Sequence, residues 1–201
     1  MHTRTYEKII RQFALNHGYM NFAQLREDGV TVKQLKELES QGILERFARG
    51  WYWCCDCGYT KPVDYKYIEI SKANPRAVIC MESACYLCGL LKKEPDVVMV
   101  ATERTDRKKM ELLFPIQRFY FQNASIPGEI RTKTTEFGSY RYYSEERSIC
   151  DCLRMGNRLE PSVYMEVVDV YRQSGRSQKR IYEYAKALRG LRNVQEAEEK
   201  E

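Results

Sequence analysis

Apolar residues recur at intervals of three and four at the start of the chain, and this spacing predicts three short helices. The first helix runs from about residue 5 to residue 17, and Gly18 follows it in the position of a left-handed C-cap. The second helix, residues 22–28, follows Asn21 as its N-cap. The third begins at Thr31, which forms a capping box with Gln34. Its apolar stripe, which we expect to face the core, consists of Val32, Leu35 and Leu38.

The period changes after Gly42, which ends the third helix. Residues 43–47 predict a strand, residues 48–50 a turn and residues 51–53 a returning strand. Three short helices followed by a hairpin are the element order of a winged helix. We therefore predict a winged helix-turn-helix domain over residues 1–60, with the segment from Cys54 to Pro62 as the loop that leads out of it.

The remaining residues, 61–201, mix both periods and predict a separate α+β domain. Residues 78–91 (VICMESACYLCGLL) predict one buried helix that Gly89 closes. β-Branched and aromatic residues predict strands at 97–101, 116–121, 129–133 and 140–143. Further helices are expected after Ser144, from Pro161 to Tyr171, and from Ser177 to Gly190.

Composition limits the class of protein more than its function. A chain of 201 residues with 43% hydrophobic and 30% charged residues is typical of a folded protein of one large or two small domains. No apolar run approaches the length of a membrane span, and the start, MHTRTYEKIIRQF, lacks the apolar core of a signal peptide. We therefore expect a cytoplasmic protein with no membrane association. A net charge of +5 is compatible with nucleic-acid binding but does not argue for it.

The polar face of the third helix carries the candidate DNA contacts. In a helix-turn-helix this face enters the major groove, where Lys and Gln side chains read guanine and adenine edges or hold phosphates. The predicted DNA-binding residues on this helix are Thr31, Lys33, Gln34, Lys36, Glu37, Ser40 and Gln41, and Arg46 and Arg49 join them on the hairpin. An ordinary surface helix has a polar face too, and winged helices also serve as protein-binding modules, so both alternatives stay open.

Three motifs carry a resemblance to a known family. They are Gly29-Val30-Thr31 with Gln34-Leu35, Gly42-Ile43-Leu44-Glu45-Arg46 and Arg49-Gly50-Trp51-Tyr52; Met81-Glu82-Ser83-Ala84 with Gly89-Leu90; and Glu146-Arg147-Ser148-Ile149-Cys150-Asp151-Cys152-Leu153-Arg154. With these motifs in this order, the chain resembles the AbiEi family, the antitoxins of type IV toxin–antitoxin (abortive-infection) systems. Cys85 and Cys88 depart from the pattern, because ordinary helix residues are expected there.

The resemblance implies two activities. The winged helix would bind repeats in the promoter of its own operon and repress it. The second domain would counter a nucleotidyltransferase-like toxin, without requiring a stable complex with it.

Basic residues gather near the end of the chain and offer a surface for this second activity. The candidate partner-binding residues are Arg172, Lys179, Arg180, Lys186 and Arg189. Such a patch could contact nucleic acid or an acidic partner. A solvated helix face is the alternative for any one of these residues.

Eight cysteines are many for a chain without a secretory signal. Two C-x-x-C pairs, Cys54/Cys57 and Cys85/Cys88, could hold a tetrahedral zinc ion. The alternative is that the cysteines of the apolar helix are small buried side chains. We expect no cofactor. If the chain binds a metal ion, zinc is the candidate. A zinc- or thiol-responsive winged-helix regulator unrelated to a toxin is accordingly the second hypothesis for function.

The sequence predicts no enzyme. It contains no G-x-S-x-G, no phosphate-binding loop and no H-E-x-x-H, and its two histidines are His2 and His17. Asp151 lies i+4 from Arg147 and i−3 from Arg154, a pattern of ion pairs along one helix. A charged site at these residues is the alternative, and a nuclease guided by the winged helix is the third hypothesis for function.

Overall fold

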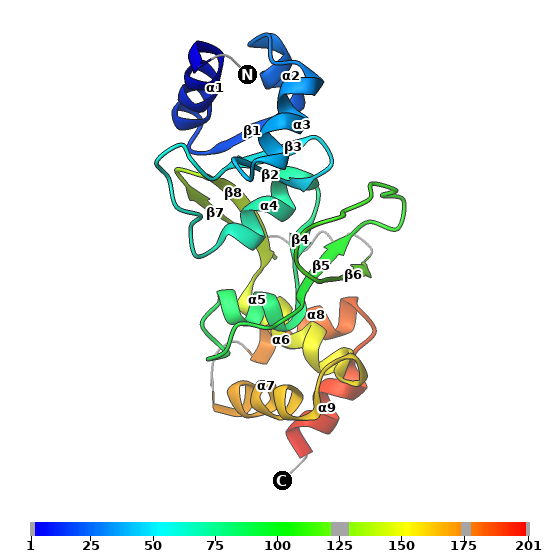
Figure 1. The fold of residues 1–201 in the computed structure, drawn as a ribbon. Coiled ribbons are helices and arrows are strands. Elements are labelled where there is room, and N and C mark those ends of the chain that lie inside the picture. Colours follow the sequence, from blue (N-terminus) through cyan, green and yellow to red (C-terminus); the bar gives the residue numbers. More distant parts are fainter. Residues whose placement is uncertain (1–2, 122–128, 174–177, 200–201) are drawn as a thin grey trace. The chain divides into compact units, whose positions relative to one another are not determined.

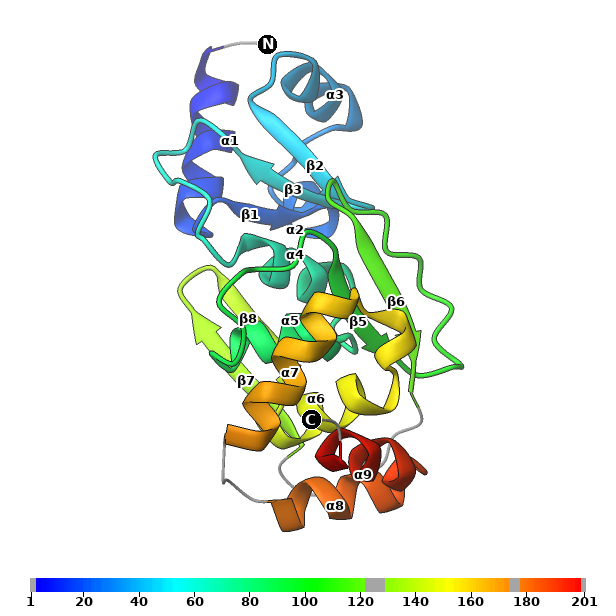
Figure 2. The same ribbon diagram turned by 90° about the horizontal axis from the view of Figure 1, so that it is seen from below.

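A computed structural model describes residues 3–121, 129–173 and 178–199 as a mixed α+β fold (Figures 1 and 2). The chain divides into two compact units. The first unit consists of Met1–Pro75, Lys108–Phe114 and Lys133–Tyr140, and the second of Arg76–Arg107, Pro115–Thr132 and Arg141–Glu201.

The first unit contains the three predicted helices and the predicted hairpin. Its elements are α1 (Thr3–Leu15), β1 (Tyr19–Asn21), α2 (Phe22–Glu27), α3 (Val32–Ser40), β2 (Leu44–Ala48), β3 (Trp51–Cys54) and α4 (Tyr65–Ala73). The strands form an antiparallel sheet in the order β1-β3-β2, so the hairpin is completed by a short strand that precedes α2. Helices α1, α2 and α3 bury Phe13, Leu25, Leu35 and Leu38 in one core.

Gly18 is required where the chain leaves α1. Its φ of 81° lies in the left-handed region, and a Cβ atom there would lie 2.4 Å from the Trp53 ring. The amide of Gly18 donates to the carbonyl of Phe13, and its carbonyl accepts from the amide of Cys54. A side chain at this position would therefore separate the end of α1 from β3.

Helix α4 lies beyond residue 60, where the prediction ended the first domain. It belongs to the first unit and buries Tyr67, Ile68, Ile70 and Ala73. Its apolar residues occur in a short run that does not stand out from the loop before it, so no helix was predicted there. The segments 108–114 and 133–140 also join this unit, although they follow much later in the sequence.

The second unit is built on a mixed sheet. Its strands are β4 (Val78–Ile79), β5 (Val98–Thr102), β6 (Ile116–Tyr120), β7 (Ile130–Thr135) and β8 (Gly138–Tyr143), in the order β6-β5-β4-β8-β7. Strand β4 is antiparallel to β5 and parallel to β8, and β5 is parallel to β6. The four predicted strands are confirmed, and β7 and β8 are longer than predicted. The last residues of β7 and the first of β8 belong to the first unit.

The prediction of one helix over residues 78–91 is wrong. Val78 and Ile79 form β4, and only Met81–Leu87 is helical, as α5. Met81 joins the two with a φ of 52°, an uncommon conformation for a residue other than glycine. The two β-branched residues are used by strand pairing on both sides of β4, which no local pattern reveals.

Helices make up the rest of the second unit. They are α6 (Glu145–Arg154), a 3-10 turn at Gly156–Arg158, α7 (Pro161–Gln173), α8 (Gln178–Ala187) and α9 (Leu191–Glu199). Ser144 caps α6 as predicted, whereas the predicted cap Ser177 lies outside the described residues. Helix α9 was not predicted, although Val194 and Ala197 are buried. Among the described residues, no helix combines the length and apolar character needed to cross a membrane.

Candidate nucleic-acid interface

Helix α3 begins at a complete capping box. The Thr31 hydroxyl accepts the Gln34 amide at 3.3 Å, and the Gln34 side-chain oxygen accepts the Thr31 amide at 2.8 Å. Both residues were predicted as DNA contacts, but in this structure their side chains bond to each other and fix the start of the helix. Their first role is therefore to orient α3.

The outer face of α3 presents the other predicted residues to solvent. Lys33, Lys36, Ser40 and Gln41 are exposed, and Glu37 is half-buried. Leu35 and Leu38 face the core as predicted. Val32 does not: 53% of it is exposed, so its prediction as a core residue is wrong. The buried apolar residue at this end of the helix is Val30, which precedes the cap.

The hairpin places two arginines beside buried aromatic residues. Strands β2 and β3 pair in antiparallel fashion, with a shift of register between Glu45 and Ala48. Phe47 is buried and packs edge-on against Tyr19, with ring centroids 5.5 Å apart. Arg46 and Arg49 are both exposed. The hairpin therefore holds two cations in solvent on a rigid base.

A buried carboxylate fixes this hairpin to α4. Glu69 is buried, and its carboxylate lies 2.8 Å from the ammonium of Lys61, which also pairs with Glu45 of β2. Burial raises the pKa of Glu69, and the Lys61 ammonium offsets only part of this shift. Burial would lower the pKa of Lys61, but the hydrogen bonds to Glu45 and Glu69 leave it raised. The hairpin base depends on residues beyond the predicted boundary.

Sequence reasoning missed two cations of α1. Arg4 and Lys8 lie one helical turn apart and line a cleft of about 410 Å³ together with Gln34 and the turn at residues 28–30. The Lys8 ammonium donates to the carbonyl of Asp28 at 3.0 Å. Their spacing of four residues on the polar face of α1 was the available signal.

The four predicted zinc ligands are divided between the two units. Cys54 and Cys57 belong to the first unit, and Cys85 and Cys88 to the second. No group of three or more His, Cys, Asp or Glu side chains arranged to hold a metal occurs in the part of the chain that the structure describes. Burial raises the pKa of the Cys54 and Cys88 thiols to about 12, which favours the neutral thiol over the thiolate that binds metal. The zinc site remains a prediction.

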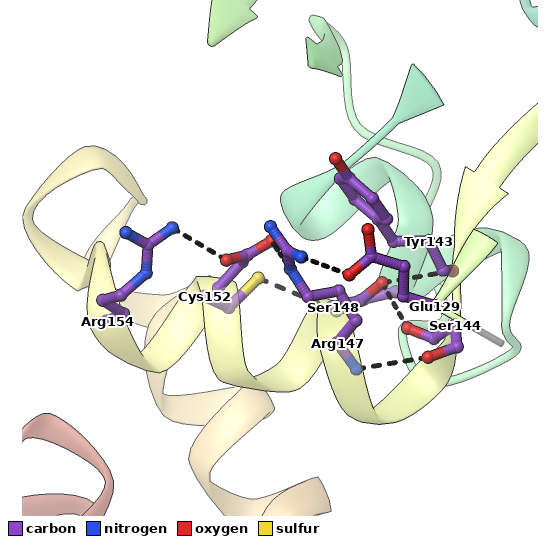
Figure 3. Close-up of polar contacts among 9 residues, drawn as sticks. Glu129, Tyr143, Ser144, Arg147, Ser148, Cys152 and Arg154 are labelled. Carbon is purple, nitrogen blue, oxygen red and sulfur yellow. Dashed lines mark hydrogen bonds and ion pairs between the residues drawn. The ribbon is translucent and has the colours of Figure 1, made fainter. Parts of the chain in front are cut away.

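The ion pairs predicted along α6 are present, but they are buried and extend beyond this helix (Figure 3). The Arg147 guanidinium donates to Asp151 at 2.7 Å and to Glu129, which precedes β7, at 2.8 Å. Arg154 donates to the other oxygen of Asp151 at 2.8 Å. The Arg147 guanidinium also lies over the Tyr143 ring at 4.4 Å. Burial would lower the pKa of Arg147, but Asp151, Tyr143 and Glu129 together raise it.

The predicted partner-binding residues are divided among several environments. Lys179, Lys186 and Arg189 are exposed on α8 and just after it. Arg172 of α7 donates to the carbonyl of Ala197 at 3.1 Å, and Arg180 lies 3.9 Å from Glu146. Arg172 is exposed too, but it and Arg180 also connect helices of the second unit, so Lys179, Lys186 and Arg189 are the available part of the predicted surface.

Comparisons with known proteins identify a fold but no family. No family model and no curated protein matches the chain. The structure is similar to the crystal structure of the RV2827C protein from Mycobacterium tuberculosis, with a TM-score of 0.65 and 12% sequence identity. The match covers 93% of this chain and 76% of that one. At this identity the similarity concerns the fold alone.

Proposed function

We propose that this protein is a DNA-binding transcriptional regulator whose first unit is a winged helix. The outer face of α3, with its exposed Lys33 and Lys36 on a helix that begins at a capping box, carries the proposal. The hairpin that follows adds Arg46 and Arg49, the position in which a wing meets the DNA backbone or minor groove. Helix α3 would enter the major groove, where Lys33 and Lys36 read base edges or hold phosphates, while the arginines would hold phosphates.

The resemblance to the AbiEi family supports a more specific role. The regulator would repress its own operon, and its second unit would counter a nucleotidyltransferase-like toxin. The exposed cations of this unit, Lys179, Lys186 and Arg189, are the proposed contact surface. Neither activity requires catalysis by this chain.

The DNA contacts are tested by replacing three cations in the full chain. In Lys33→Ala/Lys36→Ala/Arg49→Ala, all three positions are exposed, so the fold should be retained. If each loses one phosphate contact, the slope of log K against log salt becomes about 2.7 less steep, at about 0.9 per contact. Fluorescence anisotropy on a duplex from the protein's own upstream region measures this slope.

Removal of three exposed cations elsewhere is the matched control. Lys179→Ala/Lys186→Ala/Arg189→Ala makes the same change in net charge at exposed positions outside the proposed DNA contacts. The slope should therefore stay close to that of the parent. A folded Lys33/Lys36/Arg49 variant that binds the promoter as tightly as the parent would remove the basis for placing α3 in the groove.

The antitoxin role is tested by co-expression with a nucleotidyltransferase-like toxin, the class of partner that the resemblance implies. We expect Lys33→Ala/Lys36→Ala/Arg49→Ala to protect cells as well as the parent does, because protection is assigned to the second unit. The reversal Lys179→Glu/Lys186→Glu/Arg189→Glu should abolish protection and leave DNA binding intact. Loss of protection in the first variant would mean that protection works through DNA binding. Full protection by the second would show that these cations form only a solvated face.

A further inference from the structure

The connection between β5 and β6 is a long segment without helix or strand. It runs from Glu103 to Pro115 and joins two parallel neighbours, a link that usually contains a helix. Long connections of this kind are uncommon in compact domains and are usually functional or disordered. Here the first part of the connection is held in one conformation by several hydrogen bonds.

A buried aspartate organises this part. Only 3% of Asp106 is exposed, and its carboxylate lies 3.3 Å from the Arg76 guanidinium and 3.6 Å from that of Arg118. Arg118 also donates to the backbone carbonyl of Asp106 at 2.9 Å and to the Thr102 hydroxyl at 2.7 Å. A carboxylate this deeply buried needs such partners. Arg118 fixes the loop against β5 and β6, and Arg76 holds it to the segment that leads into β4.

The fixed conformation projects two further arginines. The Asp106 amide donates to the carbonyl of Glu103 at 3.0 Å, which closes a turn with Arg104 and Thr105 at its corner. Arg104 and Arg107 are exposed, and within the described residues neither forms an ion pair. Together with Arg76 and Arg118, they make four guanidinium groups, whereas Glu103 and Asp106 contribute two carboxylates, so positive charge is in excess. We call Arg76, Arg104, Arg107 and Arg118 with Asp106 the arginine loop.

We propose that the arginine loop is a second DNA-binding element, in which Arg104 and Arg107 contact backbone phosphates of duplex DNA. The inference rests on the proposed function of the first unit. A guanidinium presents planar pairs of N–H groups that match a phosphate, and a turn that is already ordered loses little entropy on binding. Contacts of this kind add affinity without sequence preference.

Anisotropy titrations with the full chain on two duplexes test the arginine loop. One duplex is the protein's upstream region, and the other is the same composition scrambled. We expect Arg104→Ala/Arg107→Ala to weaken binding to both by the same factor and to make the salt slope about 1.8 less steep, from about 0.9 per phosphate contact. The ratio of the two affinities should stay at the parent value. Arg104→Lys/Arg107→Lys should restore most of the slope.

The control removes two lysines of the same unit that lie between α5 and β5. Lys92→Ala/Lys93→Ala makes the same change of charge at exposed positions and should leave the slope unchanged. An unchanged slope in the arginine variant, or an equal effect in the control, overturns the arginine loop and leaves the winged helix standing. If the parent binds neither duplex, the proposed function fails and the loop assignment fails with it.

Discussion

Replacement of Arg147 by alanine is expected to destabilise the protein by about 3–5 kcal/mol, the usual cost of removing one partner from a buried ion pair. Its guanidinium is fully buried and is shared by Asp151 and Glu129 (Figure 3). The variant leaves two carboxylates in the core, with Arg154 as the remaining cation on Asp151. Because a domain is stable by about 5–15 kcal/mol in total, much of the second unit's stability should be lost. Urea unfolding followed by circular dichroism measures the change.

An exposed pair on α9 provides the matched control for this experiment. Arg192 and Glu196 form an ion pair at the same i,i+4 spacing and the same distance of 2.7 Å, but 90% of the Arg192 side chain is exposed. Arg192→Ala should cost no more than about 0.5 kcal/mol, because surface pairs contribute little. Equal effects of the two substitutions would contradict the assignment of a structural role to the buried network.

Truncation after Thr60 is expected to unfold the first unit. The cut removes α4, with its buried Tyr67, Ile68 and Ile70, and it removes both Lys61 and Glu69. Burial of one isoleucine side chain contributes about 1.5–3 kcal/mol to the free energy of unfolding. The fragment 1–60 should therefore show no cooperative thermal transition by circular dichroism.

The fragment 1–75 is the comparison, because it retains α4 and ends where the first unit's main segment ends. It lacks residues 108–114 and 133–140, so we expect it to be less stable than the full chain and more ordered than 1–60. A cooperative transition of 1–60 at the same midpoint as 1–75 would show that residue 60 is an adequate boundary after all.

Local hydrogen bonding explains which elements the sequence revealed. The N-caps Asn21, Thr31 and Ser144 and the turn glycine Gly50 act on residues within three or four positions, so their patterns can be read directly. The exposure of Lys33 and Lys36 followed from helical spacing in the same way. Val32 is the exception, because it is exposed whereas Val30, before the cap, belongs to the buried core.

Partners distant in sequence explain what the sequence did not reveal. Val78 and Ile79 became a strand because β5 and β8 lie on either side of them. The ion pairs along α6 could be predicted from spacing, but the burial of Arg147 between Glu129 and the Tyr143 ring could not. In residues 103–109 (ERTDRKK), nothing local indicates that Asp106 is buried and paired with Arg76 and Arg118.

The most direct test of a sequence-specific DNA-binding function is nuclease footprinting of the parent protein on its own upstream region, with a scrambled duplex beside it. We expect a discrete protected segment on the upstream duplex at protein concentrations that leave the scrambled duplex uniformly cleaved. We also expect that Lys33→Ala/Lys36→Ala/Arg49→Ala removes this protection. Uniform cleavage of both duplexes at all concentrations, or equal protection along both, would contradict sequence-specific DNA binding.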